Sequence, residues 1–144
     1  MPPAQRHDRD CGGANVSPQL SWRHAPPGTA AFAILMHDLD APGRGWWHWA
    51  VANIPAQIHS LPANASASGA LHAMGALQAR NDYNDTGYGG PCPPPGQRHR
   101  YVLTVYALKA PLERLVADRP APFFEHEIVD RPLAKATLTF YDER

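Results

Sequence analysis

Four polar side chains that could take part in binding or catalysis stand near the ends of expected strands. Asp38 follows a short apolar run, and His48 lies between two tryptophans at the head of the next run. His99 and Tyr101 open a third run, directly after a loop rich in glycine and proline. A carboxylate, two imidazoles and a phenol on loops at strand ends can form a binding site if the fold gathers them. Taken singly, each is also explained by a turn cap, a core histidine or a packing tyrosine.

The sequence lacks the residue spacings of common metal and nucleophile sites. Its eight histidines include no His-Glu-x-x-His pair, and its two cysteines form no Cys-x-x-Cys pair. It has no Gly-x-Ser-x-Gly elbow, and its glycine-rich loop does not end in the Lys-Ser/Thr of a P-loop. Cys92, in that loop, is the only candidate nucleophile. We therefore expect no metal, no cofactor and no catalytic residue.

The overall composition limits the classes of partner and the cellular compartment that we expect. Lys and Arg together number 13, as do Asp and Glu, so the net charge is zero and predicts no nucleic-acid partner. No apolar run is long enough to span a bilayer, and the polar start of the chain does not read as a signal peptide. These features predict a cytoplasmic protein without stable membrane insertion. In a reducing compartment Cys11 and Cys92 are expected to be free thiols.

The elements that must position the candidate site are mainly strands. Apolar runs with strand length or strand alternation cover residues 31–37, 46–54, 100–107 and 136–141. One helix is expected over 122–131 and a shorter turn over 112–117, and the Ala/Ser/Gly-rich stretch 62–81 is expected to be a connector. At 144 residues we expect one domain, 1–144, mainly β, arranged as a sandwich or open barrel with helical trimming.

Several blocks, in order along the chain, carry a resemblance to a known family. They are Asn15-Val-Ser-Pro-Gln-Leu-Ser-Trp22, Pro26-Pro-Gly-Thr29, His37-Asp-Leu-Asp-Ala-Pro42, Trp46-Trp-His-Trp-Ala-Val-Ala-Asn-Ile-Pro55, Asn81-Asp-Tyr83, Gly87-Tyr-Gly-Gly-Pro-Cys-Pro-Pro-Pro-Gly96, His99-Arg-Tyr101 and Val105-Tyr-Ala-Leu108. Together they resemble the bacterial Raf-kinase-inhibitor-like branch of the phosphatidylethanolamine-binding protein family. The resemblance covers roughly residues 11 to 141.

The resemblance implies a fold of two antiparallel β-sheets with short peripheral helices and a small anion pocket near the surface. The residues that match the family's pocket motifs are Asp38, His48, Gly90, Pro91, His99 and Tyr101. Asp40 matches the second aspartate of the Asp motif, and we assign it to holding that loop. A backbone N–H near Gly90 or Cys92 is expected to donate to the ligand. The resemblance also implies that both cysteines flank the pocket motifs, and that the protein forms a homodimer.

This sequence departs from the family pattern in three places. Leu39 replaces the usual proline of the Asp motif, which predicts a less rigid loop. The N-terminus is short, which places one sheet edge in question. The segment 43–46 lacks the tyrosine that animal members have near the pocket, so Arg44 is either a substitute contact or a solvated turn residue.

Three functions remain open at this point. The leading hypothesis is a module that binds a small phosphorylated or anionic ligand, with His48 and His99 donating as protonated imidazoles. The second is a hydrolase of phosphoesters or esters that uses Asp38, His48 and His99 as acid and base. The third is an interaction protein that modulates a kinase or protease partner.

Overall fold

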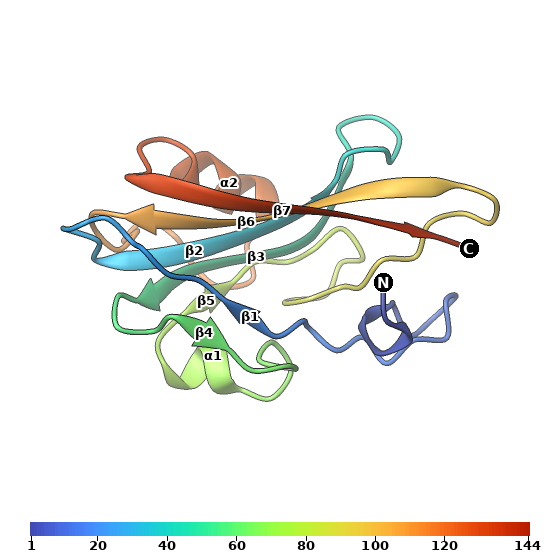
Figure 1. Cartoon of the computed structure of the whole chain (residues 1–144), viewed down its shortest axis with the longest axis horizontal. Coiled ribbons are helices and arrows are strands. Elements are labelled where there is room, and N and C mark those ends of the chain that lie inside the picture. Colours follow the sequence, from blue (N-terminus) through green and yellow to red (C-terminus); the bar gives the residue numbers. More distant parts are fainter.

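The computed structural model describes all 144 residues and is built mainly from antiparallel strands (Figure 1). The strands are β1 (Leu20–Ser21), β2 (Ala31–Asp38), β3 (Trp46–Pro55), β4 (Ser60–Leu61), β5 (Leu77–Gln78), β6 (Arg98–Leu108) and β7 (Ala134–Glu143). The helical segments are η1 (Pro3–Gln5), α1 (Ala70–Ala73) and α2 (Ala121–Ile128). None of these helices is long and apolar enough to cross a membrane.

The strands form two antiparallel sheets. The larger sheet has five strands in the order β5-β3-β2-β6-β7, and the smaller one pairs β1 with β4. Residues 39–45 join β2 to β3 as a hairpin, whereas the link from β6 to β7 is longer and carries α2. The predicted fold class, two antiparallel sheets with short peripheral helices, is confirmed.

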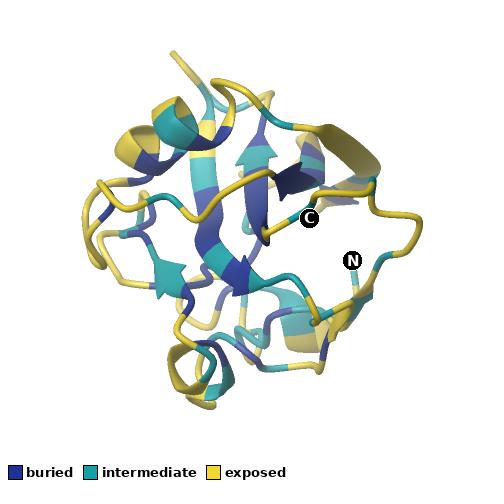
Figure 2. Cartoon of the chain, turned by 90° about the vertical axis from the view of Figure 1, so that its left-hand side faces the viewer, coloured by how far each residue is buried: buried dark blue, intermediate teal, exposed yellow.

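The central strand β2 is buried on both faces because a layer covers each side of the sheet. Phe32, Ile34 and Met36 pack in the core that reaches β4 and α1, while Leu35 packs in the core that reaches α2. In Figure 1, α2 lies over one face of the large sheet and the β1–β4 pair with α1 lies beyond the other. The outer face of α2 is exposed, and its inner face, toward the sheet, is buried (Figure 2). Alternation along one strand therefore supplies both cores.

The main elements were predicted to within a few residues, and the short ones were not. The expected helix over 122–131 begins one residue earlier and ends at Ile128, ahead of Pro132, which cannot continue a helix. Residues 112–117 form turns without a helix, and the connector 62–81 contains the short α1 and β5. Elements of two to four residues depend on tertiary contacts that no local pattern encodes.

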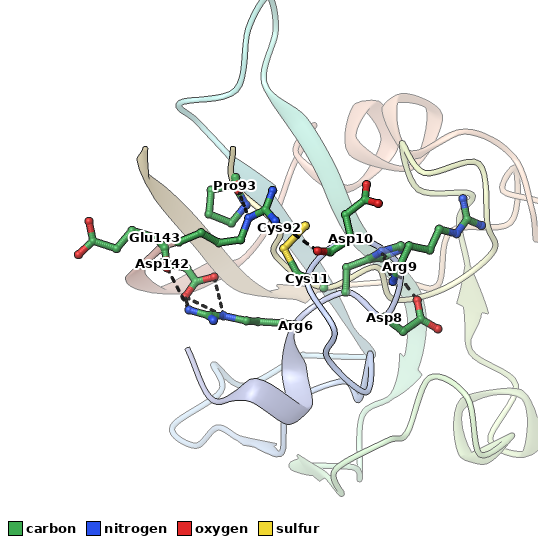
Figure 3. The surroundings of a disulfide bond; sticks show 12 residues. Arg6, Asp8, Arg9, Asp10, Cys11, Cys92, Pro93, Asp142 and Glu143 are labelled. Carbon is green, nitrogen blue, oxygen red and sulfur yellow. Dashed lines mark hydrogen bonds and ion pairs between the residues drawn. A yellow bond between two sulfur atoms is a disulfide. The ribbon is translucent and has the colours of Figure 1, made fainter. Parts of the chain in front are cut away.

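The prediction of free thiols is wrong, because Cys11 and Cys92 form a disulfide (Figure 3). The bond joins positions 81 apart and ties the N-terminal segment to the Gly/Pro loop. Further contacts hold the same segment: Arg6 pairs with the buried carboxylate of Asp142 at 2.7 Å, and Arg144 donates to the carbonyl of Asp10 at 3.2 Å. The N-terminal segment is thus fastened to the Gly/Pro loop and to the end of β7.

Candidate functional site

A cavity of about 230 Å³ opens where the end of β2 meets the starts of β3 and β6. Antiparallel pairing causes this meeting, since Asp38 lies opposite Trp46 on one neighbouring strand and Tyr101 on the other. The cavity is lined by Asp38, Ala41, Pro42, Trp46, His48, Tyr83, Cys92, Pro93, Pro94, His99 and Tyr101. Four of the six predicted ligand-binding residues are therefore together. Each of these four is at most 4% exposed, so they form the floor of the cavity.

Asp38 is an orienting group for both the pocket and its loop. Its Oδ2 lies 2.6 Å from Nδ1 of His99, and its Oδ1 accepts the backbone N–H of Asp40 at 2.9 Å. The other ring nitrogen of His99 lies 3.0 Å from Oε1 of Gln97. Both nitrogens of His99 thus have partners within the chain, and a ligand reaches Nε2 only by displacing the exposed Gln97 side chain.

Asp40 fastens the Asp38 loop to β6. Its carboxylate accepts the backbone N–H of Arg100 at 2.7 Å and pairs with the guanidinium at 3.0 Å. The side-chain hydrogen bond from Arg100 holds the pKa of Asp40 below its usual value. These contacts support the predicted role in holding the loop, and they act where Leu39 replaces the usual proline.

His48 differs from the donor expected from the sequence. Its Nδ1 lies 2.7 Å from the carbonyl oxygen of Gly89, and a carbonyl only accepts, so Nδ1 carries the hydrogen. Burial lowers the pKa of His48 to about 4, which leaves the ring neutral near pH 7. Its Nε2 then carries a lone pair, and no group of the chain donates to it. A neutral ring that accepts at Nε2 contrasts with the protonated, donating His48 expected from the sequence.

The hydroxyl of Tyr101 is able to act as the donor that the sequence predicts. Its ring stacks on Phe140 with centroids 5.5 Å apart and is fully buried. Burial raises the pKa of Tyr101 well above its ordinary value, so the phenol keeps its hydrogen. The chain supplies no hydrogen-bond partner for this hydroxyl. Because Tyr101 lines the cavity, its hydroxyl is left to donate to a ligand or to water.

Gly90 and Pro91 do not line the cavity. The N–H of Gly90 donates to Oδ1 of Asn15 at 2.7 Å, so it is unavailable as the expected ligand donor. A side chain at Gly90 would collide with the backbone of Gln5 to His7, and the carbonyl of Pro91 accepts the N–H of His7 at 3.1 Å. These residues support the wall from behind. The wall itself is formed by the next three residues, Cys92, Pro93 and Pro94.

Two aromatic residues of the cavity were not singled out from the sequence. Tyr83 stacks on His7 at 3.9 Å, approaches His48 edge-on and donates its hydroxyl to the carbonyl of Gly90 at 2.8 Å. Trp46 packs edge-on against Tyr83 at the exposed rim. Both stand in blocks quoted for the family resemblance, which was the only available signal. Arg44, the suggested substitute contact, is exposed and does not line the cavity.

A wider groove of about 380 Å³ lies between α2 and the preceding loop. It contains Arg114, Arg119 and His126 beside exposed Phe123, and the Arg119 guanidinium lies 4.4 Å from the centre of the Phe123 ring. Its polar groups are exposed, whereas those of the smaller cavity are buried and held in place. No group of three or more His, Cys, Asp or Glu side chains is placed to hold a metal ion. The smaller cavity is therefore the candidate site.

Comparison with known proteins agrees with this fold. A family model described as phosphatidylethanolamine-binding protein matches residues 3–141. The UPF0098 protein YbcL of Escherichia coli (strain K12) is 49% identical over 102 residues, which are 69% of this chain and 56% of YbcL. The UPF0098 protein YbhB of the same strain is 44% identical over 110 residues, covering 76% of this chain and 68% of YbhB. This chain thus matches little more than half of the first of these relatives.

A crystal structure of YbcL from E. coli, described as a new member of the mammalian PEBP family, has the same fold. It aligns with a TM-score of 0.94 at 36% identity, covering 100% of this chain and 90% of that one. The match of a family model to nearly the whole chain, the identity to both relatives and the shared fold lead to one conclusion. This chain belongs to the phosphatidylethanolamine-binding protein family.

Proposed function

We propose that this protein reversibly binds a small phosphate ester in the cavity formed by Asp38, His48, His99 and Tyr101. The observation that carries the proposal is that His48 and Tyr101, two buried residues, line one cavity, where Nε2 of His48 and the hydroxyl of Tyr101 have no hydrogen-bond partner in the chain. A phosphate group offers several oxygens within a small volume, and these can accept from the phenol. Trp46 and Tyr83 would contact the rest of the ligand at the rim.

The cavity size favours a headgroup-sized ligand over a large one. Its volume of about 230 Å³ is below the usual range for drug-sized ligands, and its walls are stiffened by Pro42, Pro93 and Pro94. Asp38 lies beside the proposed anion, and its bond to His99 offsets part of the repulsion when that ring is protonated. Gly90 and Pro91 would act through the wall that they support.

Replacing Tyr101 by Phe is expected to weaken binding of a phosphate monoester by roughly 10- to 100-fold. The change removes one hydrogen bond to a charged group, about 1.5–3 kcal/mol, and leaves the ring stacked on Phe140. Stability should hardly change, because the lost hydroxyl has no partner within the chain. Calorimetric titration with methyl phosphate and a urea melt of both proteins make the comparison. Equal affinities would place the ligand elsewhere.

The hydrolase alternative rests on one observation, the short Asp38–His99 contact, which resembles an orienter and a base. The base lacks a nucleophile, because Cys92 is held in the disulfide and Nε2 of His99 faces Gln97. We expect no phosphatase or esterase activity to follow the pure protein, as measured with p-nitrophenyl phosphate and acetate. An activity that co-purifies and disappears in folded His99→Ala protein would overturn the binding assignment.

The remaining inferences from the resemblance stay predictions. A kinase or protease partner would be found by pull-down, and a homodimer by native mass spectrometry, which would also detect a retained ligand. The cytoplasmic location has one observation against it, since disulfides persist mainly in oxidising compartments. Fractionation of the producing cell tests the location directly.

A further inference from the structure

The tautomer of His48 defines what the cavity floor can bind. Gly89 holds this residue twice: its carbonyl accepts from Nδ1 at 2.7 Å, and its N–H donates to the His48 carbonyl at 2.8 Å. The ring is 2% exposed, and burial lowers its pKa to about 4. The nitrogen left for a ligand is therefore Nε2, which accepts a hydrogen bond and has none to donate.

The charges around His48 disfavour a doubly charged ligand. The titratable groups facing it are Asp38 and His37 from β2, His99 and Tyr101 from β6, Tyr83 from the loop before β6, and His7 from the N-terminal segment. The cavity lining includes the Asp38 carboxylate and contains no Lys or Arg. A phosphate dianion would place its second charge against a lone pair and near a carboxylate, with no cationic side chain of fixed charge to offset it.

We propose that the cavity selects a phosphate monoester in its singly protonated form, with the P–O–H group donating to Nε2 of His48. This inference rests on the proposed function and names the protonation state that the site takes. The remaining phosphoryl oxygens accept from the hydroxyl of Tyr101 and from any N–H of His99 freed when Gln97 is displaced. The ligand then supplies one donor and several acceptors to a floor that offers one acceptor and at least one donor.

The proposal predicts a pH dependence set by the ligand. A phosphate monoester loses its second proton with a pKa of about 6. Above that value the monoanion fraction falls tenfold per pH unit, so the association constant should fall by about tenfold between pH 7 and pH 8. An alkyl phosphonate has a higher second pKa, so its profile should be displaced to higher pH. An alkyl sulfate is a monoanion without an acidic hydrogen, so it should bind much more weakly throughout.

The test is a calorimetric titration of the full chain with methyl phosphate, methylphosphonate and methyl sulfate between about pH 5.5 and pH 8.5, a range that includes the second pKa of the phosphate ester. The proposal is supported if the affinity for methylphosphonate falls at a higher pH than the affinity for methyl phosphate, and if methyl sulfate binds weakly. Coincident profiles would mean that a protein group titrates instead, and sulfate binding equal to phosphate would mean that no donor to His48 is needed; either overturns it. Absence of binding by all three ligands would overturn the proposed function itself.

Two variants separate the role of His48 from a general loss of affinity. His48→Gln places an amide at the floor, whose N–H can donate to a dianion, so the pH dependence should become flatter. Tyr101→Phe removes a donor and should lower affinity at every pH without changing the shape of the profile. A His48→Gln protein that melts normally and keeps the wild-type pH profile would contradict the proposal, whatever its absolute affinity.

Discussion

The double variant Cys11→Ser/Cys92→Ser is expected to lose about 4 kcal/mol of unfolding free energy. The disulfide joins positions 81 apart, so it closes a long loop in the unfolded chain and limits its conformational freedom. The N-terminal segment keeps its noncovalent contacts, including the bonds of Asn15 to Gly90 and Tyr88, and the folded state should survive. Urea unfolding of both proteins without reductant measures the loss.

The matched control is wild-type protein unfolded in the presence of a dithiol reductant. Reduced wild type and the serine variant should have the same stability, because both lack the cross-link. Thiol counting on denatured wild type, purified without reductant, should find no free thiol. Two free thiols, together with equal stability of variant and oxidised wild type, would contradict the pairing.

Acidification is expected to destabilise the fold by about 3 kcal/mol through His48 alone. Its pKa is about 4 in the folded state, lowered from 6.5 by burial, so the unfolded chain binds a proton that the folded protein refuses. The stability is complete above pH 6.5 and falls as the pH drops toward 4, at about 1.4 kcal/mol per pH unit. Burial also lowers the pKa values of His7 and His37, so both add to the loss in the same direction.

The contribution of His48 to this pH dependence is measured by comparing wild type with His48→Gln. Both proteins are unfolded in urea at several pH values from about 7.5 to about 4.5, a range that includes the ordinary histidine pKa. The variant should be less stable near neutral pH, because the bond to the Gly89 carbonyl is changed, but its stability should fall less steeply. A parallel fall in both proteins would mean that His48 takes up its proton equally in the folded and unfolded states. That result would also remove the basis for the selection of a monoanion.

Much of the fold could be predicted because each long strand shows its apolar run or its alternation within its own residues. The apolar run that became β2 and the alternation that became β6 both lie in the structure within two residues of their expected bounds. The short elements α1 and β5 could not be predicted, since a helix of four residues and a strand of two are fixed by what they pack against. Strands were therefore predicted correctly where they were long enough to show a repeating pattern of apolar residues.

The site was predictable in its polar residues and less so in its surroundings. Asp38, His48, His99 and Tyr101 were found because strand ends and family motifs both marked them. Gly90 was misplaced because a motif position does not tell which side of a wall a residue faces. Its N–H is taken by Asn15, 75 positions away, which no local pattern shows.

The chemistry of His48 could not be read from the sequence at all. A histidine between tryptophans is compatible with a charged donor or a neutral acceptor, and the choice is made by burial and by the Gly89 carbonyl, 41 positions away. The disulfide could not be predicted for the same reason, because two cysteines 81 positions apart meet only when the N-terminal segment packs against the Gly/Pro loop. Long-range contacts therefore decided both corrections.

The most direct test of the central claim is a titration of the protein with methyl phosphate near pH 6, about where the ligand is half protonated. The proposed cavity predicts saturable binding of one ligand per chain, weakened in Tyr101→Phe and unchanged in Arg119→Ala, which alters the separate groove beside α2. Absence of saturable binding, or binding that survives Tyr101→Phe and disappears in Arg119→Ala, would contradict the account.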